Sequence, residues 1–173
     1  NVSLVDLNAD PIQSFSADGV STQSQDHPID MLVLATGYDA VSGSMLHLNP
    51  RGRQGVPLQQ KWAERFDNHL GITVAGFPNM FMILGPHAAL GNNPRSIEHN
   101  VEWIGNFLDY MRKNNLNGAE ATISSVDEWH ELVSGKAESL LSNEVDSWMT
   151  GVNLNVEGKQ TRTVVRYTGT APE

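Results

Sequence analysis

The chain has 173 residues, enough for one ordinary domain with a hydrophobic core. Hydrophobic residues make up 39% of it and charged residues 18%, which is typical of a globular protein and not of a disordered one. The formal net charge of −9 argues against a nucleic-acid-binding surface, which would need a basic stripe. The absence of cysteine excludes disulfides, cysteine-based zinc sites and thiol nucleophiles, and it is compatible with the cytoplasmic location that we expect.

The sequence carries no targeting or membrane signal that we recognise. No apolar run reaches 18 residues, so no membrane span is expected. The first ten residues lack a basic region followed by an apolar core, so they are not expected to be a signal peptide. They resemble the middle of a domain, and we expect the chain to be a piece of something longer.

The first part of the chain is predicted to be mostly extended. A short strand is expected at Asn1–Leu7, and the alternating pattern of Ile12–Thr22 predicts a hairpin with Asp18–Gly19 at its tip. Met31–Ala35 are continuously apolar, as in a central parallel strand that is covered on both faces. Residues 42–70 are rich in glycine, proline and basic residues, and we interpret them as an irregular loop.

Two further strands are predicted before the middle of the chain. Residues 71–77 form one extended segment, and the wholly apolar run Met80–Leu84 has the pattern of a buried strand. Gly85–Pro86 ends this strand, because proline has no N–H with which to continue a hydrogen-bonded ladder.

A long helix follows, and its apolar residues recur at intervals of three and four: Ile97, Val101, Ile104, Leu108 and Met111. Two starts fit the sequence, one with Ser96 as N-cap and one with Asn93 as N-cap and Pro94 at the first helical position. Either start directs free backbone N–H groups into the loop behind the preceding strand, a place that suits an anion or an electron-rich ligand edge. Open α/β sheets also bind ligands there, outside the carboxyl ends of their strands.

A second long helix is predicted after a turn at Lys113–Asn115. Ser125 and Glu128 match a capping box, and the helical stripe runs on to Trp148. The tail is rich in glycine and becomes β-prone at Thr163–Tyr167.

Motifs with a known chemistry are largely missing. The six histidines show no metal-ligand spacing, so no metal site is expected. The chain has no G-x-S-x-G elbow, no G-x-G-x-x-G and no Walker loop, so a hydrolase triad and a phosphate cradle are both unsupported. The residues alone support an α/β fragment with a candidate ligand edge at residues 85–96.

Four motifs in order nevertheless resemble one enzyme family. They are DMLVLATGYDA, FPNMFMILGP, SIEHNVEWI and DSWMTGVN. Together they are similar to the C-terminal third of the Baeyer–Villiger monooxygenases, a group of class B flavin-dependent monooxygenases, and the similarity runs from about Asn1 to about Tyr167.

The resemblance implies an α/β flavoprotein with two dinucleotide-binding domains, for FAD and NADPH, whose C-terminal part contains two long helices. Residues 1–36 would close the NADPH-binding domain, and residues 37–173 would form the C-terminal part of the FAD-binding domain with a substrate-pocket loop. The implied reaction uses FAD, NADP(H) and O₂ to insert one oxygen next to a ketone carbonyl, giving an ester or lactone. Two alternatives stay open: a class B enzyme that oxygenates nitrogen or sulfur, and a non-catalytic structural or interaction fragment.

Site residues follow from the same resemblance. Cofactor contacts are implied for Thr36, Gly37, Asp39, Gly85, Pro86, Asn93, Pro94, Ser96 and Trp148. The loop that lines the substrate pocket is implied to include Ala88, Ala89, Leu90 and Asn92. For Trp148 the alternative is a core position on the helical stripe, and for Thr36, Gly37 and Asp39 it is a tight structural linker.

The chain departs from the family pattern in two respects. The segment GVNLNVEGK is two residues longer than the family's Gly-x-Asn-x-Pro-Gly-Lys and lacks its proline, so the loop after Trp148 is expected to differ. The family's phosphate loops, fingerprint motif and catalytic arginine would lie upstream of Asn1, in the remaining N-terminal part of the enzyme. No catalytic residue is therefore expected in this chain.

Overall fold

The computed structural model describes residues 1–89 and 91–169. The chain divides into two compact units, Asn1–Gly37 and Tyr38–Glu173.

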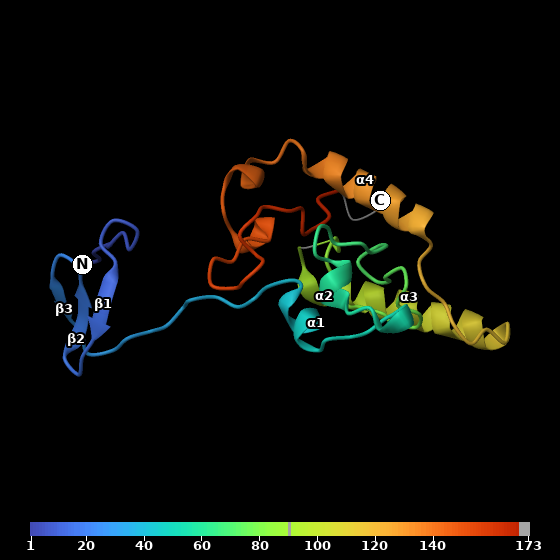
Figure 1. Cartoon of the computed structure of the whole chain (residues 1–173), viewed down its shortest axis with the longest axis horizontal. Coiled ribbons are helices and arrows are strands. Elements are labelled where there is room, and N and C mark those ends of the chain that lie inside the picture. Colours follow the sequence, from blue (N-terminus) through green and yellow to red (C-terminus); the bar gives the residue numbers. More distant parts are fainter. Residues whose placement is uncertain (90, 170–173) are drawn as a thin grey trace. The chain divides into compact units, whose positions relative to one another are not determined.

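The first unit is built on one small antiparallel sheet (Figure 1). Its strands are β1 (Ile12–Phe15), β2 (Gly19–Thr22) and β3 (Asp26–Pro28), in the order β1-β2-β3. The hairpin predicted from Asp18–Gly19 is confirmed, and the hydroxyl of Ser16 accepts hydrogen bonds from the backbone N–H groups of both tip residues.

Two predicted strands of this unit are wrong. Residues 1–7 and 31–35 form no strand, and Met31 is 78% exposed. A parallel strand is held by hydrogen bonds to neighbours on both sides. No described strand lies beside either segment to supply those bonds, so an apolar sequence alone does not make a strand here.

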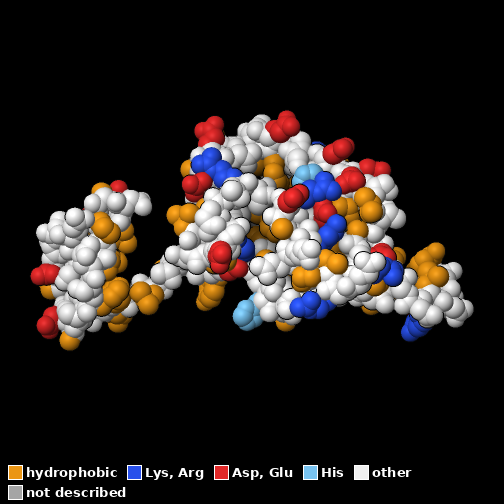
Figure 2. Space-filling view, viewed as in Figure 1, with side chains coloured by type: hydrophobic (Ala, Val, Ile, Leu, Met, Phe, Trp, Pro, Cys, Tyr) orange, Lys and Arg blue, Asp and Glu red, His pale blue; other side chains and the backbone are white. Residues whose placement is uncertain are grey.

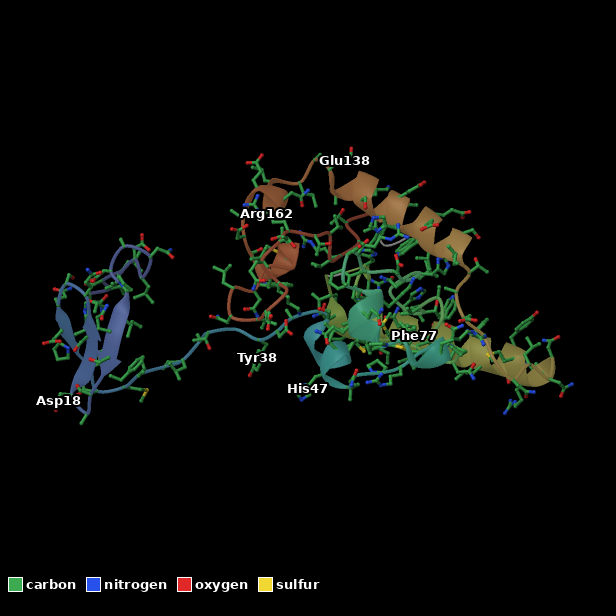
Figure 3. All side chains as sticks on the ribbon, in the orientation of Figure 1. Asp18, Tyr38, His47, Phe77, Glu138 and Arg162 are labelled. Atoms are coloured by element: carbon green, nitrogen blue, oxygen red, sulfur yellow. The ribbon has the colours of Figure 1, made fainter. Side chains whose placement is uncertain are left out.

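The hydrophobic core of the second unit joins residues 42–70, for which the sequence predicts an irregular loop, to residues 74–82. The first of these segments contains α1 (Gly43–His47), η1 (Arg53–Gly55) and α2 (Leu58–Lys61). The buried residues of the core are Leu58, Trp62, Val74, Phe77 and Met82, of which Phe77 is labelled in Figure 3. The indole N–H of Trp62 donates to the Asp67 carbonyl at 3.0 Å, which satisfies the one polar atom of that buried ring.

The strands predicted at residues 71–77 and 80–84 are also wrong. The two segments touch through isolated bonds, such as Met82 N–H to the Ile72 carbonyl at 2.8 Å. Asn79 and Leu84 have left-handed backbone angles, with φ of 60° and 53°, which turn the chain out of an extended ladder.

The predicted central helix is confirmed as α3 (Asn93–Lys113). Its N-cap is Asn92, one residue before the earlier of the two predicted caps, and the Asn92 side chain accepts a hydrogen bond from the Arg95 N–H at 3.3 Å. The predicted apolar stripe is mostly uncovered, since Val101 is 51% exposed while Met111 is buried. Exposed apolar side chains are visible on both units in Figure 2.

The second predicted helix is shorter than its stripe indicates. It is α4 (Ile123–Ala137), and Thr122 caps it in place of the predicted Ser125. The chain turns extended at Leu140 and then forms η2 (Leu141–Glu144) and η3 (Trp148–Thr150). The Asn143 amide donates to the Ala137 carbonyl, which satisfies a free carbonyl of the last helical turn.

The β-prone tail forms a short parallel pairing in place of a full strand. His87 N–H donates to the Val165 carbonyl at 3.0 Å, and Tyr167 N–H donates to the Ala88 carbonyl at 3.1 Å. Ala89 and Tyr167 form an isolated parallel bridge. The tail is thereby fixed beside the loop that the sequence assigns to the substrate pocket.

Candidate functional site

A buried histidine joins three segments behind the predicted substrate loop. The His87 side chain is 1% exposed, and its Nε2 lies 2.9 Å from the Val164 carbonyl. Its Nδ1 lies 3.3 Å from the Asn68 amide nitrogen, while Asn68 Oδ1 accepts from the Gly71 N–H. Burial lowers the pKa of His87 to about 4, so the ring is neutral at pH 7, with Nε2 donating and Nδ1 accepting.

Close backbone packing fixes the start of the same loop. Ala88 is buried, and a side chain at Gly71, which has φ +68°, would lie 2.8 Å from the Ala88 Cβ. Gly85 donates its N–H to the Gly71 carbonyl at 3.2 Å, and Pro86 is fully buried. The side chain of Ala88 therefore faces Gly71 in this structure and not open space.

Asp39 is tied to the loop that follows Trp148. The Lys159 ammonium forms an ion pair with the Asp39 carboxylate and donates to Ser42 Oγ at 2.9 Å. The Asn153 N–H donates to the Lys159 carbonyl at 2.8 Å, which closes the lengthened loop on itself. The lysine of this closed loop contacts the Asp39 turn.

Two residues near these contacts, Val41 and Leu84, have strained backbone angles. Val41 has φ 63°, and Ser42 N–H donates to the Ala40 carbonyl at 2.8 Å, which makes a tight turn centred on a β-branched residue. Leu84 has φ 53°, and its N–H donates to Oδ1 of the buried Asn100 in α3 at 3.1 Å. Such conformations cost about 1–3 kcal/mol each and concentrate at functional sites.

Trp148 stands apart from the hydrophobic core. It begins η3 outside α4 and is 52% exposed, so the core alternative is not supported. Ser147 and Thr150 form a capping box around this turn, which fixes the backbone below the indole ring.

Trp148 lines two cavities. The first, of about 250 Å³, is called the Lys159 cavity here; its wall includes Asp39, Ser42, Trp62 and Lys159. The second, of about 420 Å³, is called the Arg166 cavity, and its wall comprises Ala40, Val41, Leu84, Gly85, Gly91, Asn93, Trp148, Val165 and Arg166. Segments far apart in sequence thus converge at one place, as expected of a binding site.

The predicted site residues fall into three groups. Asp39, Gly85, Asn93 and Trp148 line one or both cavities. Thr36 and Gly37 belong to the first unit, and Leu90 lies outside the described residues. The others line neither cavity: Pro86, Ala88, Ala89, Asn92, Pro94 and Ser96.

Lys159 and Arg166 are among the charged residues at these cavities that were not predicted as site residues. Lys159 is the lysine of the segment GVNLNVEGK, so the motif itself could have pointed to it. Arg166 lies in the β-prone tail, and its place in the cavity depends on the pairing of that tail with His87–Ala89. No local sequence signal reports such a pairing.

Replacing Asn92 with alanine should destabilise α3 by about 1 kcal/mol, because the N-cap side chain satisfies a helix N–H that would otherwise lack a partner. Asn92→Asp should retain the cap. Urea unfolding of the two variants measures the difference, and an equal loss in both would contradict the capping role.

Some classes of site have no support in the part of the chain that is described. No group of three or more His, Asp or Glu residues there could hold a metal ion. No helix within residues 1–89 and 91–169 is both long and apolar enough to cross a membrane.

Known proteins resemble the chain over nearly its whole length. It is 38% identical over 170 residues to cyclohexanone 1,2-monooxygenase from Acinetobacter sp., covering 98% of this chain and 31% of the relative. A solved structure of OTEMO in complex with FAD and NADP matches with a TM-score of 0.85 at 30% identity, over 99% of this chain and 31% of the other. The predicted resemblance to the Baeyer–Villiger monooxygenases is confirmed.

The α/β fold class is confirmed by the same structural match to a monooxygenase that binds FAD and NADP.

Not every similar protein is named for a ketone. Phenazine N-monooxygenase PhzNO1 from Lysobacter antibioticus is 39% identical over 172 residues, covering 99% of this chain and 31% of the relative. The chain spans about a third of the length of these relatives, and no protein-family model matches it.

Proposed function

We propose that the chain is the C-terminal portion of an NADPH- and FAD-dependent Baeyer–Villiger monooxygenase, which inserts one oxygen of O₂ next to a ketone carbonyl to give an ester or lactone. The observation that carries this proposal is the convergence of Gly85, Asn93 and Trp148 on the Arg166 cavity. Gly85 and Trp148 come from two of the motifs that carry the family resemblance, FPNMFMILGP and DSWMTGVN, and Asn93 lies just before a third, SIEHNVEWI.

The domain assignment is part of this proposal. Residues 1–36 would close a Rossmann-type NADPH-binding domain, and residues 37–173 would form the C-terminal part of the FAD-binding domain. A cytoplasmic location is proposed with it, because the chain has no cysteine and the reaction consumes NADPH.

The cavity walls suit the ring systems of the two cofactors better than their phosphates. Trp148 offers a half-exposed aromatic face, and a side chain at Gly91 would meet no other atom within 4 Å. No G-x-G-x-x-G sequence is present to cradle a pyrophosphate. When bound, FAD supplies the oxygen-transfer chemistry and NADPH the hydride, while this chain shapes and shields the cavity.

Two chain segments would hold the cavity's geometry during the reaction. The Lys159 ammonium holds the Asp39–Ser42 turn, so Ala40 and Val41 present a fixed wall. The side chain of Asn100, in α3, accepts a hydrogen bond from the backbone N–H of the strained Leu84 and so fixes its position. Loops held in this way position substrates while their exposed side chains vary between related enzymes.

The remaining N-terminal part of the enzyme is proposed as the partner that covers the exposed apolar surface. The stripe residues Ile97, Val101 and Leu108 are uncovered by the described residues, although they repeat on one face of a long helix. Relatives about three times as long as this chain have the additional residues to cover such a face.

Oxygenation of nitrogen is the second candidate function. It is favoured by the similarity to phenazine N-monooxygenase, whose identity of 39% is within one per cent of the 38% found for cyclohexanone 1,2-monooxygenase. The same cavity would then receive an aromatic nitrogen heterocycle, stacked on Trp148.

Product analysis separates the two reactions. The complete flavoprotein is incubated with NADPH under ¹⁸O₂, with cyclohexanone in one reaction and phenazine in the other. We expect a lactone with one ¹⁸O from the ketone. Formation of phenazine N-oxide with no lactone from any ketone would assign the second function, and the absence of both products would leave the non-catalytic alternative.

A further inference from the structure

Arg166 brings the one charge to the described wall of the Arg166 cavity. The other eight described residues of this wall are alanine, valine, leucine, glycine, asparagine and tryptophan, so no carboxylate is among them. A neutral ketone carries no charge with which a guanidinium could form an ion pair. The proposed reaction therefore leaves Arg166 unexplained.

The guanidinium of Arg166 also has no partner among the described residues. Other arginines of the second unit form ion pairs: Arg53 with Glu120 at 2.7 Å, and Arg162 with Asp146 at 2.6 Å. Arg166 is half-buried, and no ion pair or side-chain hydrogen bond forms to it within residues 1–89 and 91–169. A half-buried guanidinium gains more from an anion than an exposed one does, because its surroundings screen the charge less.

The backbone fixes where Arg166 stands. Its two chain neighbours, Val165 and Tyr167, are both buried and both bonded to the His87–Ala88 segment. The chain bends at Arg166, between these two bonded residues, so the place of its backbone is fixed from both sides. The position of the charge relative to Gly85 and Trp148 is thus set by paired backbone.

We propose that Arg166 binds an anionic group carried by the substrate, so that the enzyme prefers a ketone with a carboxylate or phosphate to its neutral counterpart. This inference rests on the proposed function. The guanidinium presents N–H donors in a planar fork that matches such groups in two simultaneous hydrogen bonds. A cavity of about 420 Å³ with an apolar wall has room for a small ring that carries one charged group.

A cofactor phosphate is the other source of this chemistry, and the cavity favours it less. Pyrophosphates are normally held by several backbone N–H groups of a glycine-rich loop, which this chain lacks. One arginine among apolar residues fits a single charge on an otherwise apolar molecule better.

The test uses the complete flavoprotein and a matched pair of cyclic ketones, one with a carboxylate substituent and one with the corresponding primary amide. The ratio of their kcat/KM values should favour the carboxylate in the natural enzyme. In Arg166→Gln this preference should fall about 10- to 100-fold, the range for a lost hydrogen-bonded charge pair. Arg166→Glu should shift the preference to a ketone that carries an ammonium group.

Arg162→Gln is the matched control, because it removes the same charge from the same tail while the residue lines neither cavity. It should keep the carboxylate preference within about twofold. A ratio that Arg166→Gln leaves unchanged would overturn the proposal. A raised KM for NADPH with an unchanged ketone ratio would assign the anion to the cofactor and would also overturn it.

Binding is measured separately, so that a failure of the proposed reaction is distinguishable from a failure of this inference. Both compounds are titrated into the oxidised enzyme and followed by tryptophan fluorescence. Tighter binding of the carboxylate that Arg166→Gln abolishes supports the role of Arg166 even if no ketone is converted. Equal affinities for the two compounds in the natural enzyme would contradict it.

Discussion

The chain is expected to lose about 3 kcal/mol of its free energy of unfolding as the pH falls from about 6.5 to about 4, through the single residue His87. The folded state holds this ring neutral, with a pKa of about 4, whereas the unfolded chain protonates it near 6.5. Between these values the unfolded state binds the extra proton, so acidification favours unfolding. The stability is fully present above the unfolded value.

The geometry explains why protonation is resisted. Protonation of His87 would add an N–H at Nδ1, which faces the amide nitrogen of Asn68. This nitrogen is itself a donor, because Asn68 Oδ1 accepts the Gly71 N–H and thereby fixes the orientation of the amide. Two N–H groups would then face each other in a buried place with no acceptor between them.

Urea unfolding of natural and His87→Gln chains across this pH range measures the effect. Glutamine can still donate to the Val164 carbonyl but does not titrate, so the variant should lose most of the pH-dependent slope while being less stable at pH 7. His99→Gln is the control, because His99 is exposed on α3 and should leave the slope unchanged. Equal slopes in the natural chain and in His87→Gln would refute the assignment.

The second large effect is expected at Trp148. In the complete flavoprotein, Trp148→Ala should weaken NADPH binding by about 2 kcal/mol, roughly thirtyfold, because a large aromatic contact is removed from the wall of both cavities. Uncoupled NADPH consumption, measured as hydrogen peroxide released per NADPH oxidised, should rise with it. FAD retention should change less.

Trp62→Ala provides the contrast in stability, because Trp62 is 6% exposed and belongs to the hydrophobic core, although it also reaches the wall of the Lys159 cavity. Trp62 is buried in the hydrophobic core, so its loss should cost about 3–5 kcal/mol of stability. Trp148 is half exposed, so Trp148→Ala should lower the melting temperature far less. If Trp148→Ala instead unfolds as readily as Trp62→Ala and its folded fraction shows natural kinetics, Trp148 is a core residue.

Local patterns predicted the elements whose determinants are local. The hairpin at Asp18–Gly19 depends on turn chemistry, and α3 depends on helical spacing and its asparagine cap, so both were found within a residue or two. The extent of α4 was overestimated, because the apolar spacing continues to Trp148 although the helix ends at Ala137. Periodicity does not report where a chain turns.

Features set by distant segments were missed for the same reason. Met31–Ala35 have the composition of a buried strand but no strand beside them among the described residues, and they are exposed. The sequence pattern predicts a loop for Leu58 and Trp62, yet they meet Val74 and Met82 to form the core. Arg166 enters the cavity only because the tail pairs with the residues after Pro86.

The most direct test of a reaction site at the Arg166 cavity is a crystal structure of the complete flavoprotein with NADP⁺ and a lactone product. We expect electron density for the lactone in contact with Trp148 and Gly85, two residues of the cavity wall. Density for the lactone in a cavity lined by none of the nine wall residues would contradict this location of the reaction.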